Sequence, residues 1–288
     1  MSKGRVEGKV AFVTGAARGQ GRSHAVRLAE EGADIIAVDL CQDIASNSYA
    51  LSRTEDLQET TRLVEKVDRR IVAIEADVRE FAQLNDAVCA GIAELGHLDI
   101  VVANAGIAPM GATDQLQGWI DVVGVNLIGV LNTVHAALPH LPEGSSIIAT
   151  GSAAAYMPND IVDQPGKDPG GNGYIVAKQG LSAYMHELAR NLSPRLIRAN
   201  VVHPTNCDTN MLQSDAMYRA FRPDLENPTR EDAIPAFPAQ QAMPVPWVDP
   251  VDISNAVVYL ASDESRYVTG MQMRIDAGSY LKNHSFHF

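Results

Sequence analysis

The feature that most constrains the fold is a regular alternation of short apolar runs with longer helical patterns. The apolar runs predict seven strands, over residues 9–14, 34–38, 71–74, 98–103, 146–150, 197–202 and 271–275. Between them, apolar residues recur at helical spacing over 23–31, 55–68, 81–95, 119–138, 174–192 and 252–262. Continuously apolar strands indicate a sheet covered on both faces, and their alternation with helices indicates parallel crossovers. We therefore predict one α/β domain over residues 1–288, built on a doubly wound parallel sheet of about seven strands.

Three stretches interrupt this alternation: residues 41–53, 156–173 and 207–250. The last is rich in proline and also carries large apolar side chains. We interpret 207–250 as a lid with an apolar underside, inserted before the last helix, because long irregular segments are commonly functional. A surface excursion that packs on itself or on a partner subunit is the alternative. The apolar residues are Met211, Leu212, Met217, Tyr218, Phe221, Phe237, Met243 and Trp247.

Composition narrows the class of partner and the compartment. The 288 residues include 23 Lys and Arg against 35 Asp and Glu, so the net charge is −12. An acidic surface argues against nucleic acid or an anionic membrane as the main partner. No apolar run approaches the roughly 20 residues of a membrane helix, and the first residues lack a signal peptide's apolar core. Three scattered cysteines and isolated histidines give no disulfide framework and no metal-ligand spacing, so we expect a cytoplasmic protein without a metal.

The first predicted strand runs into a glycine-rich turn that opens a helix, over residues 14–21. Glycines in such a turn let backbone N–H groups approach a diphosphate, which then faces the positive end of the helix. The order strand, glycines, helix indicates a dinucleotide site, and a purely structural turn is the alternative. From this turn we select Gly15, Ala17, Arg18, Gly19, Gln20 and Gly21 as cofactor-binding residues.

Asp39 ends the second predicted strand, 24 positions after Gly15. A carboxylate in this place accepts hydrogen bonds from the adenosine ribose and repels a 2′-phosphate, which favours NAD over NADP. Arg18 is the counter-argument, since a basic residue in the glycine turn can pair with that phosphate. A turn or helix cap is the alternative role for Asp39, and Leu40 follows it in the same predicted site.

The third and fourth predicted strands end in residues that suit the rest of a dinucleotide. Asp77 and Val78 follow the third strand, where the adenine would lie. Asp77 could accept a hydrogen bond from the exocyclic amine or cap the next helix. Asn104, Ala105 and Gly106 end the fourth strand, where small residues let the backbone pass close to a flat ring. The Asn104 amide can also tie adjacent strands together.

A second group of residues points to proton transfer. Tyr174 and Lys178 lie four positions apart, on one face of a predicted helix. A phenol is a poor base at neutral pH, but an adjacent ammonium favours the phenolate and lowers its pKa. Ser152, after the fifth strand, could hold a carbonyl or alcohol oxygen beside the phenol, or be a turn serine. Asn126 lies in an otherwise apolar run and needs buried partners, so a structural cross-link is its alternative role.

Together these residues resemble the short-chain dehydrogenase/reductase family, and the resemblance covers nearly the whole chain. It implies a Rossmann-type fold with strand order 3-2-1-4-5-6-7 and hydride transfer between NAD and an alcohol/carbonyl pair. The joint occurrence of the motifs in this order carries it. They are Thr14-Gly-x3-Gly-x-Gly21, Asn104-Ala-Gly106, Asn126, Ser152, Tyr174-x3-Lys178 and His203-Pro204-Thr205.

The resemblance also implies a role for each matched residue. Tyr174 would be the acid/base, and Ser152 would orient the substrate oxygen. Lys178 would contact the nicotinamide ribose and tune the tyrosine, while Asn126 would support a water relay to bulk solvent. Pro204-Thr205 would lie at the nicotinamide, with the threonine contacting its carboxamide.

Two departures from the usual pattern point to one branch of the family. The gap from Ser152 to Tyr174 is 22 residues, which is long, and the segment after Asp39 is extended. With the opening residues 8–21, these features are similar to an actinobacterial branch described as mycofactocin-coupled, which includes carveol dehydrogenase-like enzymes. The branch resemblance implies tightly bound, non-exchanging NAD and an external redox partner, mycofactocin. An insertion over the adenosine half of NAD would be a physical cause of such retention.

We therefore predict an NAD-dependent enzyme that interconverts a secondary alcohol and a ketone on an apolar substrate, such as a cyclic terpenoid. An enoyl reductase or epimerase of the same fold, and a non-enzymatic NAD-binding sensor, are the alternatives. Apolar residues on more than one helix face, together with the family resemblance, predict a homotetramer. The residues are Val130, Val134, Ala137, Ala183, Leu188 and Ala189, with C-terminal groups at 276–279 and 286–288.

Overall fold

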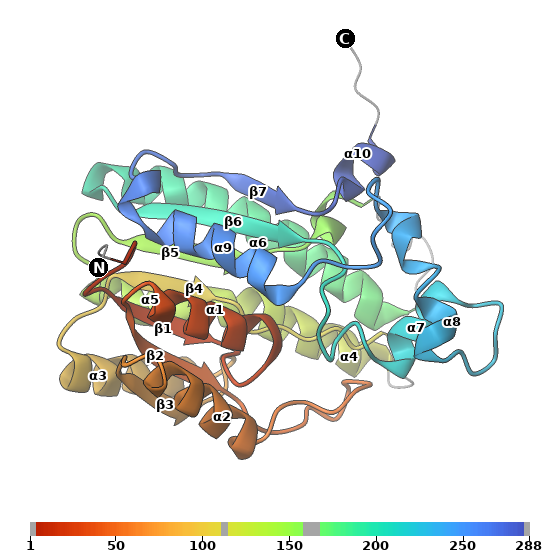
Figure 1. The fold of residues 1–288 in the computed structure, drawn as a ribbon, viewed down its shortest axis with the longest axis horizontal. Coiled ribbons are helices and arrows are strands. Elements are labelled where there is room, and N and C mark those ends of the chain that lie inside the picture. Colours follow the sequence, from red (N-terminus) through yellow and green to blue (C-terminus); the bar gives the residue numbers. More distant parts are fainter. Residues whose placement is uncertain (1–3, 111–114, 158–167, 285–288) are drawn as a thin grey trace, which may run out of the picture.

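The computed structural model describes residues 4–110, 115–157 and 168–284. At its centre is a seven-stranded parallel sheet in the order β3-β2-β1-β4-β5-β6-β7, which confirms the predicted order (Figure 1). β1 lies between β2 and β4 in this order, with Phe12 paired to Ile36 on β2 and to Val101 on β4. The strands are β1 (Val10–Thr14), β2 (Asp34–Asp39), β3 (Ile71–Glu75), β4 (Ile100–Ala103), β5 (Ser146–Thr150), β6 (Arg198–Pro204) and β7 (Gln272–Ile275).

Helices cover both faces of the sheet. On one face lie α1 (Gly19–Glu30), α2 (Thr54–Glu65) and α9 (Pro250–Ala261), which share one hydrophobic cluster with the strands. On the other face lie α3 (Phe81–Leu95), α5 (Gly129–Ala137) and α6 (Pro169–Leu192), which share a second cluster. α4 (Gln115–Val123) packs against α6 and continues into α5. The two clusters make this the doubly wound fold that the sequence predicts.

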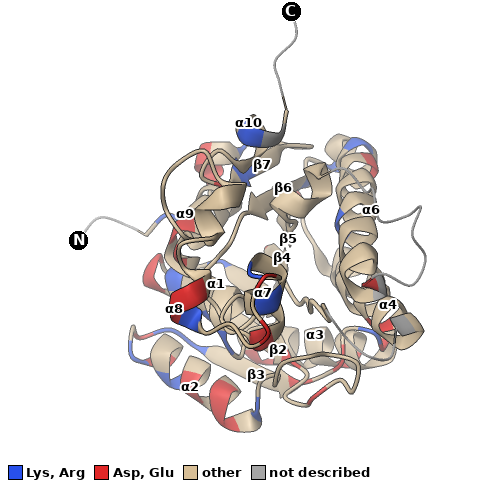
Figure 2. Ribbon diagram, turned by 90° about the vertical axis from the view of Figure 1, so that its right-hand side faces the viewer, with Lys and Arg blue, Asp and Glu red and all other residues tan. Residues whose placement is uncertain are grey.

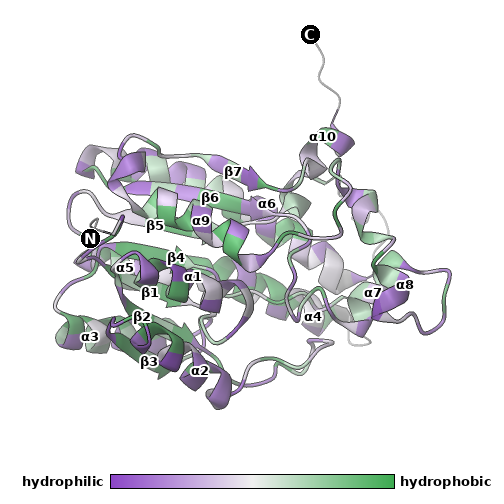
Figure 3. Ribbon diagram, viewed as in Figure 1, coloured by the Kyte–Doolittle hydropathy of each residue, from purple (hydrophilic) through white to green (hydrophobic). Residues whose placement is uncertain are grey.

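Burial differs between the middle and the edges of the sheet. Every residue of β1, β4, β5 and β6 is buried, whereas β3 and β7 alternate between half-buried and exposed positions. The prediction that all strands are covered on both faces is therefore wrong for the two edge strands. An edge strand has a neighbour on one side only, so fewer helices reach over it. In Figure 3 the edge strand β7 is largely hydrophilic, whereas the edge strand β3 has the hydrophobic colour of β1 and β4.

Two helices begin earlier than the apolar pattern predicts. α1 begins at Gly19 instead of residue 23, so its first turn is part of the glycine-rich turn. α6 begins at Pro169 instead of Tyr174, and the Asp168 side chain accepts a hydrogen bond from the Gly171 N–H at 3.1 Å. Glycine-rich sequence resembles a loop, but a proline and a capping carboxylate at its start favour a helix. Tyr174 therefore lies in the second turn of α6, with helical residues before and after it.

The predicted helix over 119–138 is a composite. A π-helical turn, Gly124–Ile128, joins α4 to α5, and a 3₁₀ turn, Leu138–His140, follows α5. By length and composition alone, the run Leu116–His140 could cross a membrane, although the sequence shows no unbroken apolar run of that length. Half of its most apolar window is buried inside the molecule. That burial is typical of a helix that covers a sheet.

The segment 207–250 contains short helices that its prolines concealed. They are α7 (Asp215–Phe221), α8 (Arg230–Ala233) and a 3₁₀ turn, Phe237–Gln240. The side chains of Ser214 and Thr229 cap α7 and α8. A further helix, α10 (Ser279–Asn283), follows β7. The prediction that the helix after the lid, α9, is the last one is therefore wrong. Prolines at the ends of short helices are compatible with helix formation, which explains why this region does not stay irregular.

The apolar groups expected at a subunit interface are mostly in the core. Val130, Val134, Ala137 and Ala189 are buried in the hydrophobic cluster that contains α5 and α6. Ala183 is exposed, and Leu188 packs half-buried against the core. In the C-terminal part Asp276 and Ser279 are buried, while residues 286–288 lie outside the described residues. The helix faces that we selected therefore serve the core, because both pack against strands.

Candidate functional site

A cavity of about 360 Å³ lies at the carboxyl end of the sheet, where ligands of doubly wound folds bind. Figure 2 looks onto this end of the molecule and places α7 in front of the central strands. Every predicted site residue lines the cavity except Ala17 and Asn126. The lining residues are Gly15, Arg18, Gly19, Gln20, Gly21, Asp39, Leu40, Asp77, Val78, Asn104, Ala105, Gly106, Ser152, Tyr174, Lys178, Pro204 and Thr205.

The glycine turn requires glycine at positions 15, 19 and 21 for steric reasons. Gly15 and Gly19 have φ of +68° and +56°, in the left-handed region. A Cβ on Gly21 would lie 1.9 Å from the Gly15 carbonyl oxygen. No side chain caps the N-terminus of α1, so its first N–H groups face the cavity without a side-chain partner among the described residues. This geometry suits a bound diphosphate.

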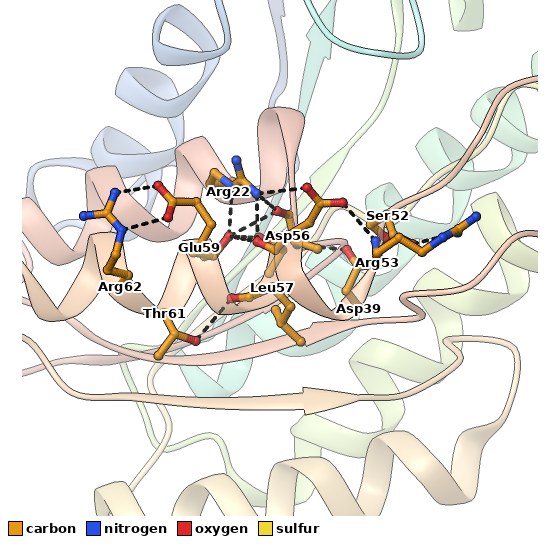
Figure 4. Close-up of polar contacts among 12 residues, drawn as sticks. Arg22, Asp39, Ser52, Arg53, Asp56, Leu57, Glu59, Thr61 and Arg62 are labelled. Carbon is orange, nitrogen blue, oxygen red and sulfur yellow. Dashed lines mark hydrogen bonds and ion pairs between the residues drawn. The ribbon is translucent and has the colours of Figure 1, made fainter.

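Asp39 accepts hydrogen bonds from three different residues at this end of the cavity. Its carboxylate accepts hydrogen bonds from the Ala17 N–H at 2.9 Å and the Cys41 N–H at 3.2 Å. It also accepts one from the Ser52 hydroxyl at 2.5 Å; Figure 4 labels both of these side chains. Ala17 thus contributes its backbone while its side chain is buried in the core. The guanidinium of Arg18 donates to the Ala50 carbonyl at 2.6 Å. The glycine turn, β2 and the 41–53 segment are therefore held as one unit.

Asp77 has a partner that the sequence did not suggest. Its carboxylate pairs with Arg79, with Nη2 to Oδ2 at 2.6 Å. The N-terminus of α3 is at Glu80 and has no side-chain cap, so the capping role for Asp77 is wrong. Arg79 also reaches Asp121 on α4, with Nη1 to Oδ1 at 3.2 Å. Asp77 is thus oriented by an arginine, beside Val78, at the end of β3.

Asn104 ties three strands together at the floor of the cavity. Its amide nitrogen donates to the Thr14 carbonyl at 3.1 Å, and its oxygen accepts from the Thr150 hydroxyl at 3.1 Å. This is the tie between adjacent strands that its position led us to expect. Ala105 and Gly106 follow it, and a Cβ on Gly15 would lie 2.8 Å from the Ala105 Cα. The backbones of β1 and β4 thus approach closely here.

Asn126 lies behind the cavity, in the π-helical turn. Its amide nitrogen donates to the Ile107 carbonyl, and its oxygen accepts from the Ile107 N–H, both at 2.9 Å. The side chain is fully buried and both of its polar groups are paired. These contacts form the structural cross-link that was the alternative reading, and a water relay through Asn126 stays a prediction.

Ser152, Tyr174 and Lys178 meet on the opposite side of the cavity from the glycine turn. A side-chain hydrogen bond joins Ser152 and Tyr174 and by itself lowers the tyrosine pKa. The Lys178 ammonium donates to the Thr150 carbonyl at 2.7 Å and lies 5.7 Å from the centre of the Tyr174 ring. Two hydroxyls on adjacent elements can thus hold one oxygen, with a cation close behind them.

Burial dominates the electrostatics of this trio. It raises the pKa of Tyr174 above its ordinary value of 10, and it lowers the pKa of Lys178 to about 8. The expected net lowering of the Tyr174 pKa is therefore wrong for these side chains by themselves. The cost of ionising a buried phenol exceeds the stabilisation from the Ser152 hydrogen bond.

Two buried oxygens that line the cavity lack a hydrogen-bond partner among the described residues. They are Gln20 Oε1, in the glycine turn, and Thr205 Oγ1, after Pro204 at the end of β6. A buried polar atom without a partner is costly, so these atoms indicate sites that a ligand completes. Thr205 lies where the resemblance puts the nicotinamide carboxamide, and α1 faces the diphosphate. The donors and acceptors present therefore fit NAD.

Comparisons with known proteins agree with this site. A family model described as Enoyl-(Acyl carrier protein) reductase matches residues 15–280. The (-)-trans-carveol dehydrogenase of Rhodococcus erythropolis is 44% identical over 284 residues, which are 96% of this chain and 99% of that protein. The crystal structure of carveol dehydrogenase from Mycobacterium avium in complex with NAD is 49% identical, with a TM-score of 0.89, and covers 97% of this chain and 100% of that one. The chain belongs to the short-chain dehydrogenase/reductase family.

A second solved structure of the family agrees with the choice of cofactor. The short chain dehydrogenase from Mycobacterium paratuberculosis bound to NAD is 40% identical, with a TM-score of 0.83, and covers 96% of this chain and 100% of that one. Family membership confirms the prediction of an oxidoreductase. Both NAD-bound neighbours agree with NAD, which Asp39 favours over NADP.

The sequence interpretation of this short-chain dehydrogenase missed several individual lining residues. Tyr49 and Leu51 reach the cavity from the 41–53 segment, and Met110 and Met157 reach it from the loops after β4 and β5. The unusual length of 41–53 was a signal for the segment, but nothing in it distinguishes Tyr49 from its neighbours. The Tyr49 hydroxyl accepts from the Ala108 N–H at 3.3 Å, a contact between residues 59 positions apart.

The lid combines both of the interpretations that the sequence left open. Met211, Leu212, Met217 and Phe221 line the cavity, as an apolar underside requires. Leu212, Tyr218, Ala233 and Phe237 also form a separate buried cluster, against which Trp247 packs. Met243 is 57% exposed and belongs to neither group. The lid is therefore a small packed unit whose inner surface faces the site.

Proposed function

We propose that this chain is an NAD-dependent dehydrogenase/reductase that interconverts a secondary alcohol and a ketone on an apolar substrate. The observation that carries the proposal is the meeting of Ser152, Tyr174 and Lys178 beside a cavity whose other half suits NAD. NAD, when bound, accepts or supplies the hydride. The 44% identical carveol dehydrogenase supports a cyclic terpenoid alcohol as the substrate class.

In this proposal the protein's residues hold the oxygen and move its proton. Ser152 and Tyr174 donate or accept hydrogen bonds at the substrate oxygen, and the Tyr174 hydroxyl exchanges the proton with it. Lys178, fixed by the Thr150 carbonyl, holds a positive charge behind the phenol and stabilises its ionised form. Arg18 to Gly21 and Asp39 bind the diphosphate and adenosine ribose, while Asp77 and Val78 lie at the adenine.

The substrate half of the cavity supports an uncharged, apolar substrate. Its described lining includes Met110, Met157, Met217 and Phe221. The charged side chains that line the described cavity are Arg18, Asp39, Asp77 and Lys178, all of which belong to the predicted cofactor or proton-transfer residues. A carboxylate or phosphate on the substrate would therefore meet no cation of its own there. This favours a terpenoid-like alcohol over an acyl carrier substrate.

The same proposal includes NAD that exchanges slowly and is reoxidised by an external partner such as mycofactocin. The support is the 41–53 segment, which lines the cavity through Tyr49, Leu51 and Ser52. We also propose a cytoplasmic homotetramer. Its support now lies in exposed apolar residues of α4 and the π-helical turn, Leu116, Ile120 and Ile128.

The test of the chemistry is Tyr174→Phe. We expect turnover of a cyclic secondary alcohol such as carveol to fall by about 10²- to 10⁴-fold with NAD affinity retained, because one proton-transfer group is lost. Tyr184→Phe is the matched control, since this half-buried tyrosine is on the same helix but does not line the cavity. Near-normal turnover in Tyr174→Phe would show that the mechanism is wrong.

The test of retention is a spectrum of the purified protein after adding carveol without NAD. A single stoichiometric rise in reduced nicotinamide that free NAD does not extend, with further carveol oxidation only when an artificial electron acceptor reoxidises the bound cofactor, would support non-exchanging cofactor. A band that keeps growing with free NAD would show ordinary exchange. NAD binding without turnover on a broad alcohol panel would favour the sensor alternative instead.

A further inference from the structure

His203, near the end of β6, is a fully buried side chain that the proposed chemistry does not use. The Ser152 N–H donates to its Nδ1 at 3.2 Å, and the same nitrogen lies 3.0 Å from the Ser152 carbonyl oxygen. On its other side, Nε2 lies 2.7 Å from Gln272 Oε1 on β7. The imidazole therefore connects the edge strand to the backbone of Ser152.

The hydrogen-bond network assigns the proton on this ring. The Gln272 amide nitrogen donates to the Ser182 carbonyl at 3.4 Å, so its oxygen faces His203 and accepts. His203 Nε2 must then carry the hydrogen, which leaves Nδ1 as the acceptor for the Ser152 N–H. Protonating Nδ1 would convert that acceptor into a donor. The ring would lose the N–H of Ser152 and hold its carbonyl oxygen instead.

Gly151, the residue before Ser152, leaves room for this contact because it has no side chain. A Cβ on Gly151 would lie 2.5 Å from His203 Nδ1 and 2.8 Å from Val201 Cγ1. The Gly151 N–H donates to the Val202 carbonyl at 2.7 Å, which keeps the end of β5 against β6. Any side chain at position 151 would therefore displace either the imidazole or the turn that carries Ser152.

We propose that His203 is a positioning residue for Ser152: its neutral ring fixes the backbone from which the serine hydroxyl meets Tyr174, and a second ring proton releases it. The inference rests on the proposed alcohol–ketone activity. It adds a residue outside the tyrosine, lysine, serine and asparagine set, and it predicts an acid-side loss of turnover that originates at His203 and not at Tyr174.

The surroundings of His203 favour the neutral ring at neutral pH. Burial is the main reason that its pKa is lowered, and the nearby cations Lys178 on α6 and Arg274 on β7 act in the same direction. The contacts with Gln272 Oε1 and with the Ser152 carbonyl oxygen raise the pKa and oppose this lowering. The Tyr156 ring, from the 3₁₀ turn Ala153–Tyr156, packs against the imidazole with 5.0 Å between the two ring centres.

The decisive variant is Gln272→Glu, which places a carboxylate at Nε2 and favours the doubly protonated ring. We expect the midpoint of the acid limb in the pH profile of kcat to move to higher pH by about one unit, with KM for the alcohol little changed. Gln272→Leu removes the partner without adding charge, and should not move the limb upward. A Gln272→Glu enzyme with an unmoved acid limb would overturn the proposal.

His203→Phe keeps a ring of similar size but has no nitrogen for Ser152. We expect kcat to fall about 10-fold or more, because misplacing a reacting group by a fraction of an ångström is costly. The acid limb that belongs to His203 should also disappear. His24→Phe is the matched control, since His24 is equally buried but bonds to Ser254 instead of the site. Equal kcat losses in the two variants would contradict a positioning role.

A measurement independent of activity separates this inference from the proposed reaction. In ¹⁵N-labelled protein, the Ser152 amide and the His203 ring should shift with one shared midpoint below pH 6.5. Gln272→Glu should raise that shared midpoint whether or not carveol is a substrate. If the ring titrates while the Ser152 amide does not respond, the proposal is wrong even in an active enzyme.

Discussion

The two segments that cover the cavity are held in different ways. The 41–53 segment is fixed by directional polar contacts to other parts of the chain, including Ser52 to Asp39 on β2 and a buried hydrogen bond of 2.6 Å from Ser46 to Asp121 on α4. The lid is fixed by packing, with Phe221 and Phe237 edge to face at 4.7 Å between ring centres. The position of the 41–53 segment is therefore set by individual hydrogen bonds, whereas the lid is held by the packing of aromatic and other apolar side chains.

The difference matches what each cover faces. Hydrogen bonds are sensitive to distance and angle, so a polar cover suits one ligand of constant shape, as a cofactor is. Apolar packing with methionine tolerates changes in shape, so the lid suits a substrate that varies. We therefore expect substitutions in the 41–53 segment to act on NAD and substitutions in the lid to act on the alcohol.

The largest effect should come from Asp39→Ala, on the cofactor side. It removes the acceptor for the Ala17 and Cys41 N–H groups and for Ser52, as well as the proposed ribose contact. We expect the Kd for NAD, measured by calorimetry on cofactor-free protein, to rise about 100-fold, since several charge-assisted hydrogen bonds are lost. Asp34→Ala, at the other end of β2, is the control and should lower stability without changing the Kd for NAD. Similar Kd changes in both variants would show that Asp39 acts only through the fold.

A smaller effect is expected from Phe221→Ala, on the substrate side. The ring lines the cavity and packs on Phe237, so its loss enlarges the apolar half. We expect KM for carveol to rise about 10-fold with the Kd for NAD unchanged, and bulkier cyclic alcohols to lose less. Steady-state kinetics over a size series of alcohols measures this. Met243→Ala, on an exposed lid side chain, should behave as the wild type. A parallel loss of NAD affinity in Phe221→Ala would remove the distinction between the covers.

Ser46→Ala tests whether the polar cover retains the cofactor. It deletes the hydroxyl that donates to Asp121, while Arg79 and Gln117 still contact that carboxylate. Loss of one buried, charge-assisted hydrogen bond should speed NAD dissociation about 10-fold, measured by stopped-flow displacement. Ser48→Ala is the matched control, because this serine is exposed in the same segment. Equal dissociation rates in the two variants would show that the segment does not act as a latch.

The remaining effect is on folding stability and not on ligand binding, and it lies at Lys178, where the two halves of the cavity meet. Its pKa is about 8 in the folded chain against an ordinary 10.5. Between these values the unfolded chain binds more protons, so the free energy of unfolding should rise with pH from 8 upward. The raised pKa of Tyr174 gives the opposite slope above pH 10, so the clear window is pH 8 to 10. Urea unfolding of cofactor-free protein should show a gain of about 2 kcal/mol that Lys178→Met lacks. Parallel pH profiles for the two proteins would contradict it.

Sequence patterns predicted the sheet and the end at which the site lies because both follow from local periodicity. Each strand is a short apolar run, and the glycine turn, Asp39, Asn104 and Ser152 each follow such a run. In a parallel sheet the carboxyl ends of neighbouring strands share one edge, so these residues were expected to converge. Tyr174 and Lys178 join them because helical spacing places both on one face of α6.

Contacts between distant residues were not predictable in the same way. Nothing local distinguishes Asp121 as a partner of Arg79 or Tyr49 as a cavity residue. The interface residues were misassigned for a related reason, since Val130 and Val134 have the same pattern whether a strand or another subunit covers them. The direction of the Tyr174 pKa shift depends on how completely the phenol is buried, which the sequence does not show.

By itself the sequence determined the order of the strands and of the helices between them, the place of the glycine turn and which residues are candidates for proton transfer. These properties are set by side-chain type and spacing, which folding does not change. Tertiary structure alone decided which groups are buried, which carboxylate has which partner, and that His203 lies beneath Ser152. Burial and pairing depend on elements brought together from far apart in the chain, and they set the energies that a spacing pattern leaves open.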